Sequence, residues 1–159
     1  MNENNEDIKE EYANLIEQLF KYEIGNHLDI DTRSVHAFII GEHGDSEIAA
    51  FSSANISGIK LDDFCEMRNH FNHKEAREEI ANKVKNSAYE IISKKKATYY
   101  GIAMAVKRIC EAIVRDEKSI LPISAMMHGE YGISDVALSM PAIIGKNGME
   151  THVPIKLDE

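Results

Sequence analysis

A histidine in a polar loop is the residue of this chain best suited to acid–base chemistry. His43 stands in the segment G-E-H-G-D-S, residues 41–46, directly after the short apolar run 34–41. An imidazole changes protonation near neutral pH, so a histidine held at the end of a strand could pass a proton to or from a bound substrate. Judged from its own loop alone, such a histidine is more often structural than catalytic. Both interpretations stay open at this point.

A cluster of cysteine and histidine raises the question of a metal site. Cys65, His70 and His73 fall within nine residues, and the two histidines have the His-x-x-His spacing at a predicted helix end. Structural zinc sites use four such ligands. Because no fourth ligand and no second pair stand nearby, we favour a solvated helix and expect no metal.

The composition excludes several classes of partner. The 159 residues carry 18 basic and 27 acidic side chains, a formal net charge of −9, which disfavours nucleic acid. Cys65 and Cys110 do not suggest a disulfide framework, which is typical of a reducing compartment. The acidic start MNENNEDIKEEY is unlike a signal peptide, and no apolar run approaches the ~20 residues that span a bilayer. We therefore expect a cytoplasmic protein with no membrane partner.

Periodic apolar residues predict long helices in the first two thirds of the chain. A first helix is expected from Ile8, closed by Gly25 and the segment 29–32. The run 34–41 has the composition of a buried strand, and 49–59 is expected to be extended. Further helices are expected at 62–71, 74–95 and 99–115.

The last third changes to strands. These are the segments SILPISAMM, DVALSMPAII and METHVPIKL, separated by HGEYG and GKNG. Asn147-Gly148 predicts a two-residue hairpin turn in which both central positions have positive φ. Helices and antiparallel strands in separate runs predict an α+β fold, one domain over residues 8–159 after a frayed start at 1–7. No G-x-G-x-x-G loop follows a strand, so we expect no Rossmann domain.

Four longer strings stand in one order along residues 20–159. They are RSVHAFIIGEHGDSE, SSANISGIKL, YEIISKKKATYYGIAMAVKRICEAI and HGEYGISDVALSMPAIIGKNG. Together they resemble the C-terminal, substrate-binding domain of the L-lactate dehydrogenase and malate dehydrogenase family, and GEHGDS favours the lactate branch. The resemblance implies long helices packed on antiparallel sheets.

The resemblance also implies an activity and roles for particular residues. The family interconverts lactate and pyruvate, in glycolysis and carboxylic acid metabolism, by hydride transfer to or from NAD. His43 falls on the histidine that moves the accompanying proton. Thr98 matches a threonine beside the methyl group of the substrate, and Ile102 matches a residue that packs on the nicotinamide. Lys96 stands where the family usually has glycine, which puts this corner of the pocket in doubt.

Two charged residues of the family pattern are absent from this chain. The family has Asp-x-x-Arg directly before a phenylalanine, which Phe20 matches, and this register puts Ile16 at the Asp and Leu19 at the Arg. In the family the Asp orients and charges the imidazole, and the Arg clamps the carboxylate of the substrate. No arginine precedes Arg33, which already belongs to the matched string. We therefore expect this chain alone to be catalytically inactive.

A second family site binds an activating anion in bacterial members. Fructose 1,6-bisphosphate is held there by an Arg and a His at a subunit interface. His36 falls on the His, and Lys21 replaces the Arg, which keeps a point charge but loses the forked geometry. A strand residue at an oligomer contact is the plainer interpretation of His36, and we favour it over an allosteric anion site.

Three hypotheses for the function result. We favour a stand-alone, non-catalytic relative that needs no cofactor and acts as a binding, oligomerising or regulatory module, with a 2-oxo acid or a sugar phosphate as candidate ligands. The alternative is part of an NAD-dependent L-lactate dehydrogenase that needs a separate nucleotide-binding partner. The third is a truncated gene product without a selected function. The start MNENNEDIKEEYANLIEQ, polar outside and periodic inside, favours the first hypothesis over the third.

Overall fold

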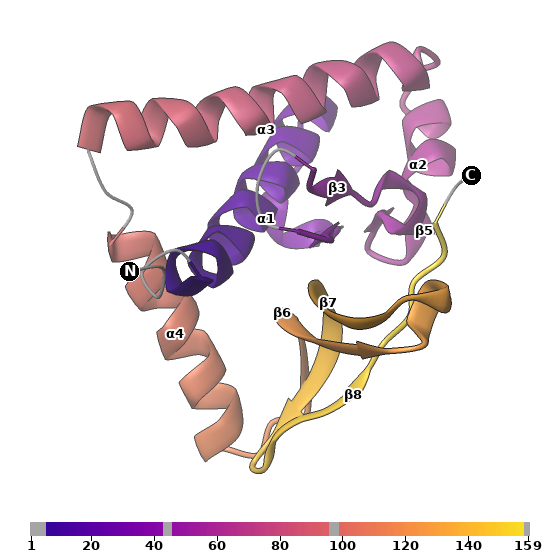
Figure 1. The fold of residues 1–159 in the computed structure, drawn as a ribbon. Coiled ribbons are helices and arrows are strands. Elements are labelled where there is room, and N and C mark those ends of the chain that lie inside the picture. Colours follow the sequence, from indigo (N-terminus) through magenta and orange to yellow (C-terminus); the bar gives the residue numbers. More distant parts are fainter. Residues whose placement is uncertain (1–5, 43–45, 96–98, 158–159) are drawn as a thin grey trace. The chain divides into compact units, whose positions relative to one another are not determined.

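The chain folds into two compact units, which are described separately. The structure, a computed structural model, describes residues 6–42, 46–95 and 99–157. The first unit contains Met1–Leu15, Ile39–Ile48 and Tyr99–Ile155, and the second contains Ile16–Phe38, Ala49–Thr98 and Lys156–Glu159. Figure 1 shows the helices and strands of both units along the chain. The α+β character predicted from the sequence is confirmed.

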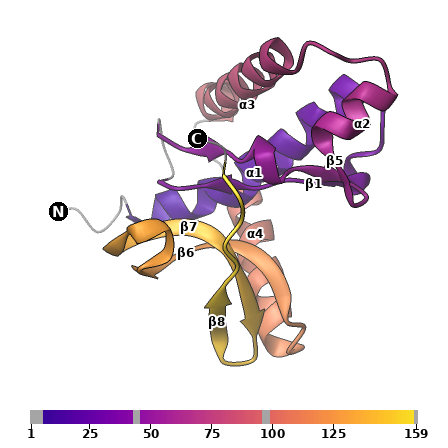
Figure 2. The ribbon, with the colours of Figure 1, turned by 90° about the vertical axis from the view of Figure 1, so that its right-hand side faces the viewer.

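The first unit is a long hairpin sheet packed on a helix. Its strands β6 (Ser119–His128), β7 (Ser134–Gly145) and β8 (Gly148–His152) form an antiparallel sheet in the order β6-β7-β8. Helix α4 (Tyr99–Val114) lies along this sheet (Figure 2). The contact is apolar because side chains from both elements are buried there: Ala112, Ala142 and Ile144, with Ile113, Leu121 and Ile123 around them.

The turn between β7 and β8 differs from the prediction by one residue. Gly145 pairs with Gly148, so the two loop residues are Lys146 and Asn147, and neither has a positive φ. Gly148 takes the positive φ, at 89°, and the register shifts at the neighbouring Ile143 and Ile144. A turn followed by a left-handed glycine is the bulged type of hairpin, in which one position instead of two needs a positive φ.

The second unit combines helices with a small sheet. The second half of helix α1 (Glu6–Leu28) belongs to this unit, as do helices α2 (Leu61–Met67) and α3 (His73–Lys95). Strands β1 (Val35–His36), β4 (Asn55–Ile56) and β5 (Ile59–Lys60) form an antiparallel sheet in the order β1-β4-β5. The predicted helix over 74–95 is confirmed by α3, whereas the helix predicted to reach Phe71 ends at Met67.

The strand predicted over 34–41 is divided in two. Strands β1 and β2 (Ile39–Ile40) are separated by Ala37 and Phe38. Strand β2 pairs with β3 (Ile48–Ala49), whereas β1 belongs to the sheet β1-β4-β5. The extended segment predicted after it contains a short 3-10 helix, Phe51–Ser53, ahead of β4 and β5. The apolar character of the run is explained by burial, since Val35, Ile39 and Ile40 are all buried.

Helix α1 continues past Gly25 and ends at Leu28, directly before the segment 29–32 that was expected to close it. Asp29 adopts a φ of 53°, and the Ile30 N–H donates to the Gly25 carbonyl at 2.9 Å, which is the Schellman way of closing a helix. Gly25 is needed inside the helix for another reason. A Cβ at this position would lie 3.0 Å from the Ile30 carbonyl oxygen, so a larger side chain would push the closing loop away.

Two phenylalanine rings hold α1 against the segment after β3. Phe20 is fully buried and meets Phe51 edge to face, with the ring centroids 4.9 Å apart at an interplanar angle of 89°. Edge-to-face pairs stabilise a core beyond the apolar area that they bury. Truncating Phe20 should therefore lower the stability of the second unit more than truncating any of its other side chains.

We expect Phe20→Ala to lower the free energy of unfolding by about 3–5 kcal/mol, because it removes a large buried side chain and leaves a cavity. Urea unfolding followed by circular dichroism measures the change. Tyr22→Ala on the exposed side of the same helix is the matched control and should change the stability little. Equal losses in the two variants would contradict the assignment of Phe20 to the core.

Candidate functional site

The stem of the loop that carries the predicted proton-transfer histidine is fixed by backbone hydrogen bonds. Gly41 and Ser139 exchange N–H···O bonds in both directions at 2.9 Å, which ties the end of β2 to β7. Beyond the loop, the Ser46 hydroxyl donates to the Glu42 carboxylate at 2.5 Å. His43 itself lies outside the described residues, so its catalytic role stays a prediction.

The two positions where the family resemblance requires charges hold apolar side chains in α1. Ile16 is only 1% exposed, so it is a core residue of this helix. Leu19 is partly buried. A buried aliphatic side chain neither accepts a hydrogen bond from an imidazole nor grips a carboxylate. The apolar character of both positions is therefore part of how the helix packs.

Neighbouring charges on the same helix do not replace the missing pair. Glu17 follows Ile16 by one residue and Lys21 follows Leu19 by two, and successive α-helical residues are rotated by about 100°. The Glu17 side chain therefore leaves the helix about 100° from the position of Ile16, and Lys21 about 200° from that of Leu19. Neither side chain therefore leaves the helix in the direction of the position that it would have to replace.

Glu17 and Lys21 form a buried ion pair instead. The Lys21 Nζ lies 2.5 Å from Glu17 Oε1, with the side chains 19% and 3% exposed respectively. The second carboxylate oxygen, Oε2, is buried without a hydrogen-bond partner. Burial raises the pKa of Glu17, and the charge and hydrogen bond of Lys21 oppose that rise without cancelling it. Burying this ion pair therefore costs free energy, and the larger part of the cost comes from the Glu17 carboxylate.

This ion pair bears on the predicted anion site of His36 and Lys21. His36 is exposed on β1, opposite Asn55 of β4. The charge of Lys21 is matched by Glu17, and its Nζ also lies 6.0 Å from the centroid of the Phe38 ring. A phosphate would have to compete with a carboxylate already in place. The anion site stays a prediction, with less positive charge to offer than the sequence suggested.

The remaining predicted residues lie in different parts of the chain. Thr98 is outside the described residues, whereas Ile102 is a partly buried residue of α4 in the first unit. Within the part of the chain that the structure describes, no three His, Cys, Asp or Glu side chains are grouped so as to hold a metal ion. His73 is used structurally, since its Nδ1 lies 3.0 Å from Asp62 Oδ1 and Arg77 contacts the same carboxylate. Among the described helices, none has the length and apolar character needed to cross a membrane.

Two features of this region were not predicted from the sequence. The first is the Glu17–Lys21 pair, although its four-residue spacing on a helix, next to apolar Ile16 and Phe20, was visible. The second is the approach of His27 to His70, with ring centroids 5.1 Å apart. No local pattern signals that contact, because 43 residues separate the two histidines along the chain.

We expect Lys21→Met to lower the free energy of unfolding at about pH 8 by about 1–3 kcal/mol, because it strands a buried carboxylate. The folded-state pKa of Glu17 is raised, so its contribution to stability is greatest at acid pH and is lost as the pH rises through that pKa. The deficit of the variant should therefore shrink towards about pH 5. Denaturant unfolding at a series of pH values measures it.

An exposed pair on α3 provides the control. Lys83 and Glu79 have the same four-residue spacing, 2.7 Å apart, but both are exposed. Lys83→Met should give no measurable change with pH, because solvent screens such pairs. A deficit of Lys21→Met that is independent of pH would contradict the burial of charge at Glu17.

Most of the chain is similar to one part of known proteins. The model of the lactate/malate dehydrogenase alpha/beta C-terminal domain matches residues 14–159. The L-lactate dehydrogenase of Acetivibrio thermocellus is 51% identical over 142 residues, which are 88% of this chain and 45% of that protein. The L-lactate dehydrogenase of Thermoanaerobacter sp. strain X514 is 49% identical over 140 residues, with the same two coverages.

Solved structures agree with this assignment. A lactate dehydrogenase from a deep-sea metagenome library of the Medee basin is 44% identical with a TM-score of 0.85, over 92% of this chain and 46% of its own. The malate dehydrogenase of Cryptosporidium parvum is 30% identical with a TM-score of 0.83, over 92% and 47%. The chain spans slightly less than half the length of these relatives. It belongs to the lactate/malate dehydrogenase family and matches the alpha/beta C-terminal domain of that family.

Proposed function

We propose that this domain does not support the lactate–pyruvate redox step and acts as a non-catalytic, oligomerising relative within its family. The observation that carries the proposal is the burial of Ile16 at 1% exposure, at the position where the resemblance requires a carboxylate. Leu19, at the position of the guanidinium, is partly buried as well. The apolar pair leaves a 2-oxo acid without its clamp and His43 without its orienting partner.

The size of the loss supports this conclusion. Removing the carboxylate that orients a catalytic histidine lowers turnover by about 10⁴-fold in a well-studied hydrolase. Removing a charge-assisted substrate clamp weakens transition-state binding further, at tenfold in rate for each ~1.4 kcal/mol. A histidine that retained its place in the loop would not compensate for either loss.

The residues of this chain do not fit a dinucleotide cofactor by themselves. The sequence contains no G-x-G-x-x-G loop after a strand, and Ile102 is an aliphatic residue of α4 that offers no polar contact. NAD, which the family resemblance implies, would need a nucleotide-binding half from elsewhere. The alternative function, one part of an NAD-dependent L-lactate dehydrogenase, requires such a half and also a substitute for the two lost charges.

A chimeric enzyme separates these possibilities. Residues 14–159 of this chain would replace the matching half of the Acetivibrio thermocellus L-lactate dehydrogenase, which supplies everything else that the reaction needs. We expect the chimera to reduce pyruvate with NADH at least about 10³-fold more slowly than the parent enzyme, because it lacks both charges. The oxidation of NADH, followed by its absorbance, measures the rate.

The matched variant restores both charges. The chimera with Ile16→Asp and Leu19→Arg should recover most of the activity, and a further His43→Gln should abolish it again. An unaltered chimera as active as the parent would overturn the proposal in favour of the alternative function. A restored chimera without activity would show that other positions cause the loss.

The second half of the proposal, oligomerisation, rests on an apolar stripe of α4. Val106, Cys110 and Val114 follow one another at four-residue intervals on this helix, so they share one face. All three are exposed, Val106 at 52% and Val114 at 84%. Exposed apolar surface of this kind is commonly covered by association, and most assemblies of identical chains are symmetric.

We expect a dimer or larger assembly at micromolar concentration, measured by light scattering after gel filtration. Val106→Glu with Val114→Glu should shift the mass towards the monomer, because charges would be buried in the interface. Lys83→Glu, on the exposed surface of α3, is the control and should leave the mass unchanged. A monomeric wild-type chain would contradict this half of the proposal and leave the first half standing.

A further inference from the structure

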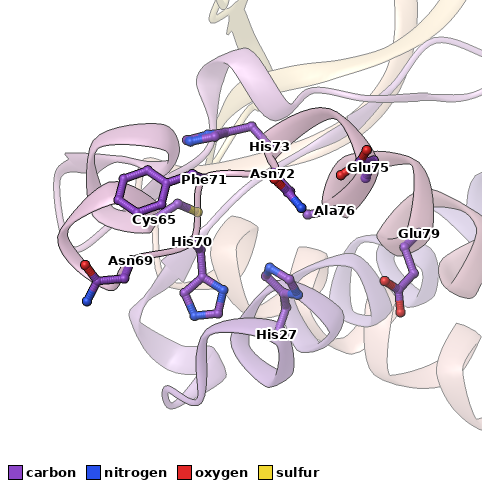
Figure 3. Close-up of a pocket in the computed structure, with 10 residues that line it drawn as sticks. All are labelled: His27, Cys65, Asn69, His70, Phe71, Asn72, His73, Glu75, Ala76 and Glu79. Atoms are coloured by element: carbon purple, nitrogen blue, oxygen red, sulfur yellow. The ribbon is translucent and has the colours of Figure 1, made fainter.

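The second unit contains a cavity of about 430 Å³ that none of the predicted site residues explains. Figure 3 shows it with His27 from α1, Cys65 from α2, His70 from the loop after α2, and Glu79 from α3. Three helices and a loop therefore contribute polar side chains to one hollow. The two histidines and the carboxylates beside them are the groups that could bind a ligand.

The ends of two helices place the histidines. His27 lies in the last turn of α1, just before the Schellman closure at Asp29. Helix α2 closes in the same way, since Asn69 has a φ of 61°, its N–H donates to the Glu66 carbonyl at 3.0 Å, and the His70 N–H donates to the Cys65 carbonyl at 2.9 Å. The backbone of His70 is therefore fixed by the fold, and its ring extends over the cavity.

The two imidazole rings face one another across a short gap. Their centroids lie 5.1 Å apart at an angle of 56°, and Figure 3 shows a nitrogen of each ring turned towards the other. In the described part of the chain neither ring is hydrogen-bonded, unlike His73, which is held by Asp62. Because neither imidazole is engaged in a hydrogen bond within the described residues, the ring nitrogens are free to bind a ligand.

This spacing is that of two imidazoles on one metal ion. A ring centroid lies about 3.2 Å from an ion bound at a nitrogen–metal distance of about 2.1 Å. Two such rings at a tetrahedral angle have centroids about 5.2 Å apart. The distance of 5.1 Å between His27 and His70 matches this value before any side chain moves.

The charges around the pair favour a cation. The carboxyl end of α1 brings the negative end of its dipole to His27, and Glu75 and Glu79 line the cavity. Lys83 is the opposing charge near His27, and it is paired with Glu79. Burial lowers the pKa of His27, the charges of His70 and Lys83 lower it further, and Glu79 acts in the opposite direction.

We propose that His27 and His70 form a two-imidazole site for a borderline divalent transition-metal ion such as Zn²⁺, with water completing the coordination. Imidazole is a preferred ligand of these ions. The described residues hold no group of three protein ligands, so water would have to fill the remaining coordination positions. The site does not depend on the proposed function, because the redox positions lie elsewhere on α1.

Calorimetric titration of the full chain with Zn²⁺ at about pH 7.5 tests the proposal. We expect one ion per chain, and His27→Ala and His70→Ala should each weaken binding by at least about tenfold, since each removes one of two ligands. Binding should also weaken at about pH 5.5, where protons compete for the imidazoles. His128→Ala, which removes an exposed histidine of β6, is the control and should leave the affinity unchanged.

A second measurement keeps the test decisive if an alanine variant unfolds. The ring resonances of histidine in the NMR spectrum of the wild-type chain should respond to Zn²⁺ at two of the seven histidines, and His27→Gln and His70→Asn should remove those responses one at a time. Overturning results are the absence of saturable binding up to about 1 mM Zn²⁺, or variants of His27 and His70 that bind as tightly as the wild type.

Discussion

The buried stripe along α1 is the constraint on which the second unit depends. Ile16, Phe20, Ile24 and Leu28 stand at every fourth position of the helix, and each is almost completely buried. Side chains at this spacing lie on one face, so the helix can bury them together. The stripe includes Ile16, the position that the family resemblance reserves for a carboxylate. In this chain the position therefore serves the packing of the helix.

Helix α1 also carries a buried charge, next to Ile16 in the sequence. A buried carboxylate needs a partner. Glu17 is such a carboxylate in α1, and Lys21, one turn later, is its partner. The pair satisfies itself within the helix and leaves Glu17 Oε2 unbonded. Charges that neutralise one another in this way are of little use to an anionic substrate. The domain thus has the family fold, and the buried charge of Glu17 is matched within the helix.

Much of this architecture follows from local sequence. The apolar periodicity of 74–95 and 99–115 predicts α3 and α4 almost to the residue, because both patterns are long and regular. The run 34–41 was expected to form a single strand, yet β1 and β2 pair with different partners, and pairing is a property of the tertiary fold. The segment 29–32 marked the end of α1 correctly, whereas Gly25 lies inside the helix at a close approach of Ile30, which no local pattern reveals. The His27–His70 contact was missed for the same reason, whereas His43 and Thr98 lie outside the described residues.

The exchange of hydrogen bonds between Gly41 and Ser139 has a consequence for how such chains are interpreted. These bonds join main-chain atoms only, so they are indifferent to the side chains of the loop that follows. Main-chain bonds of this kind hold the two ends of a loop in place whether or not the histidine within it takes part in catalysis. The sequence of this loop is therefore evidence of family membership, whereas the side chains of helix α1 bear more directly on activity.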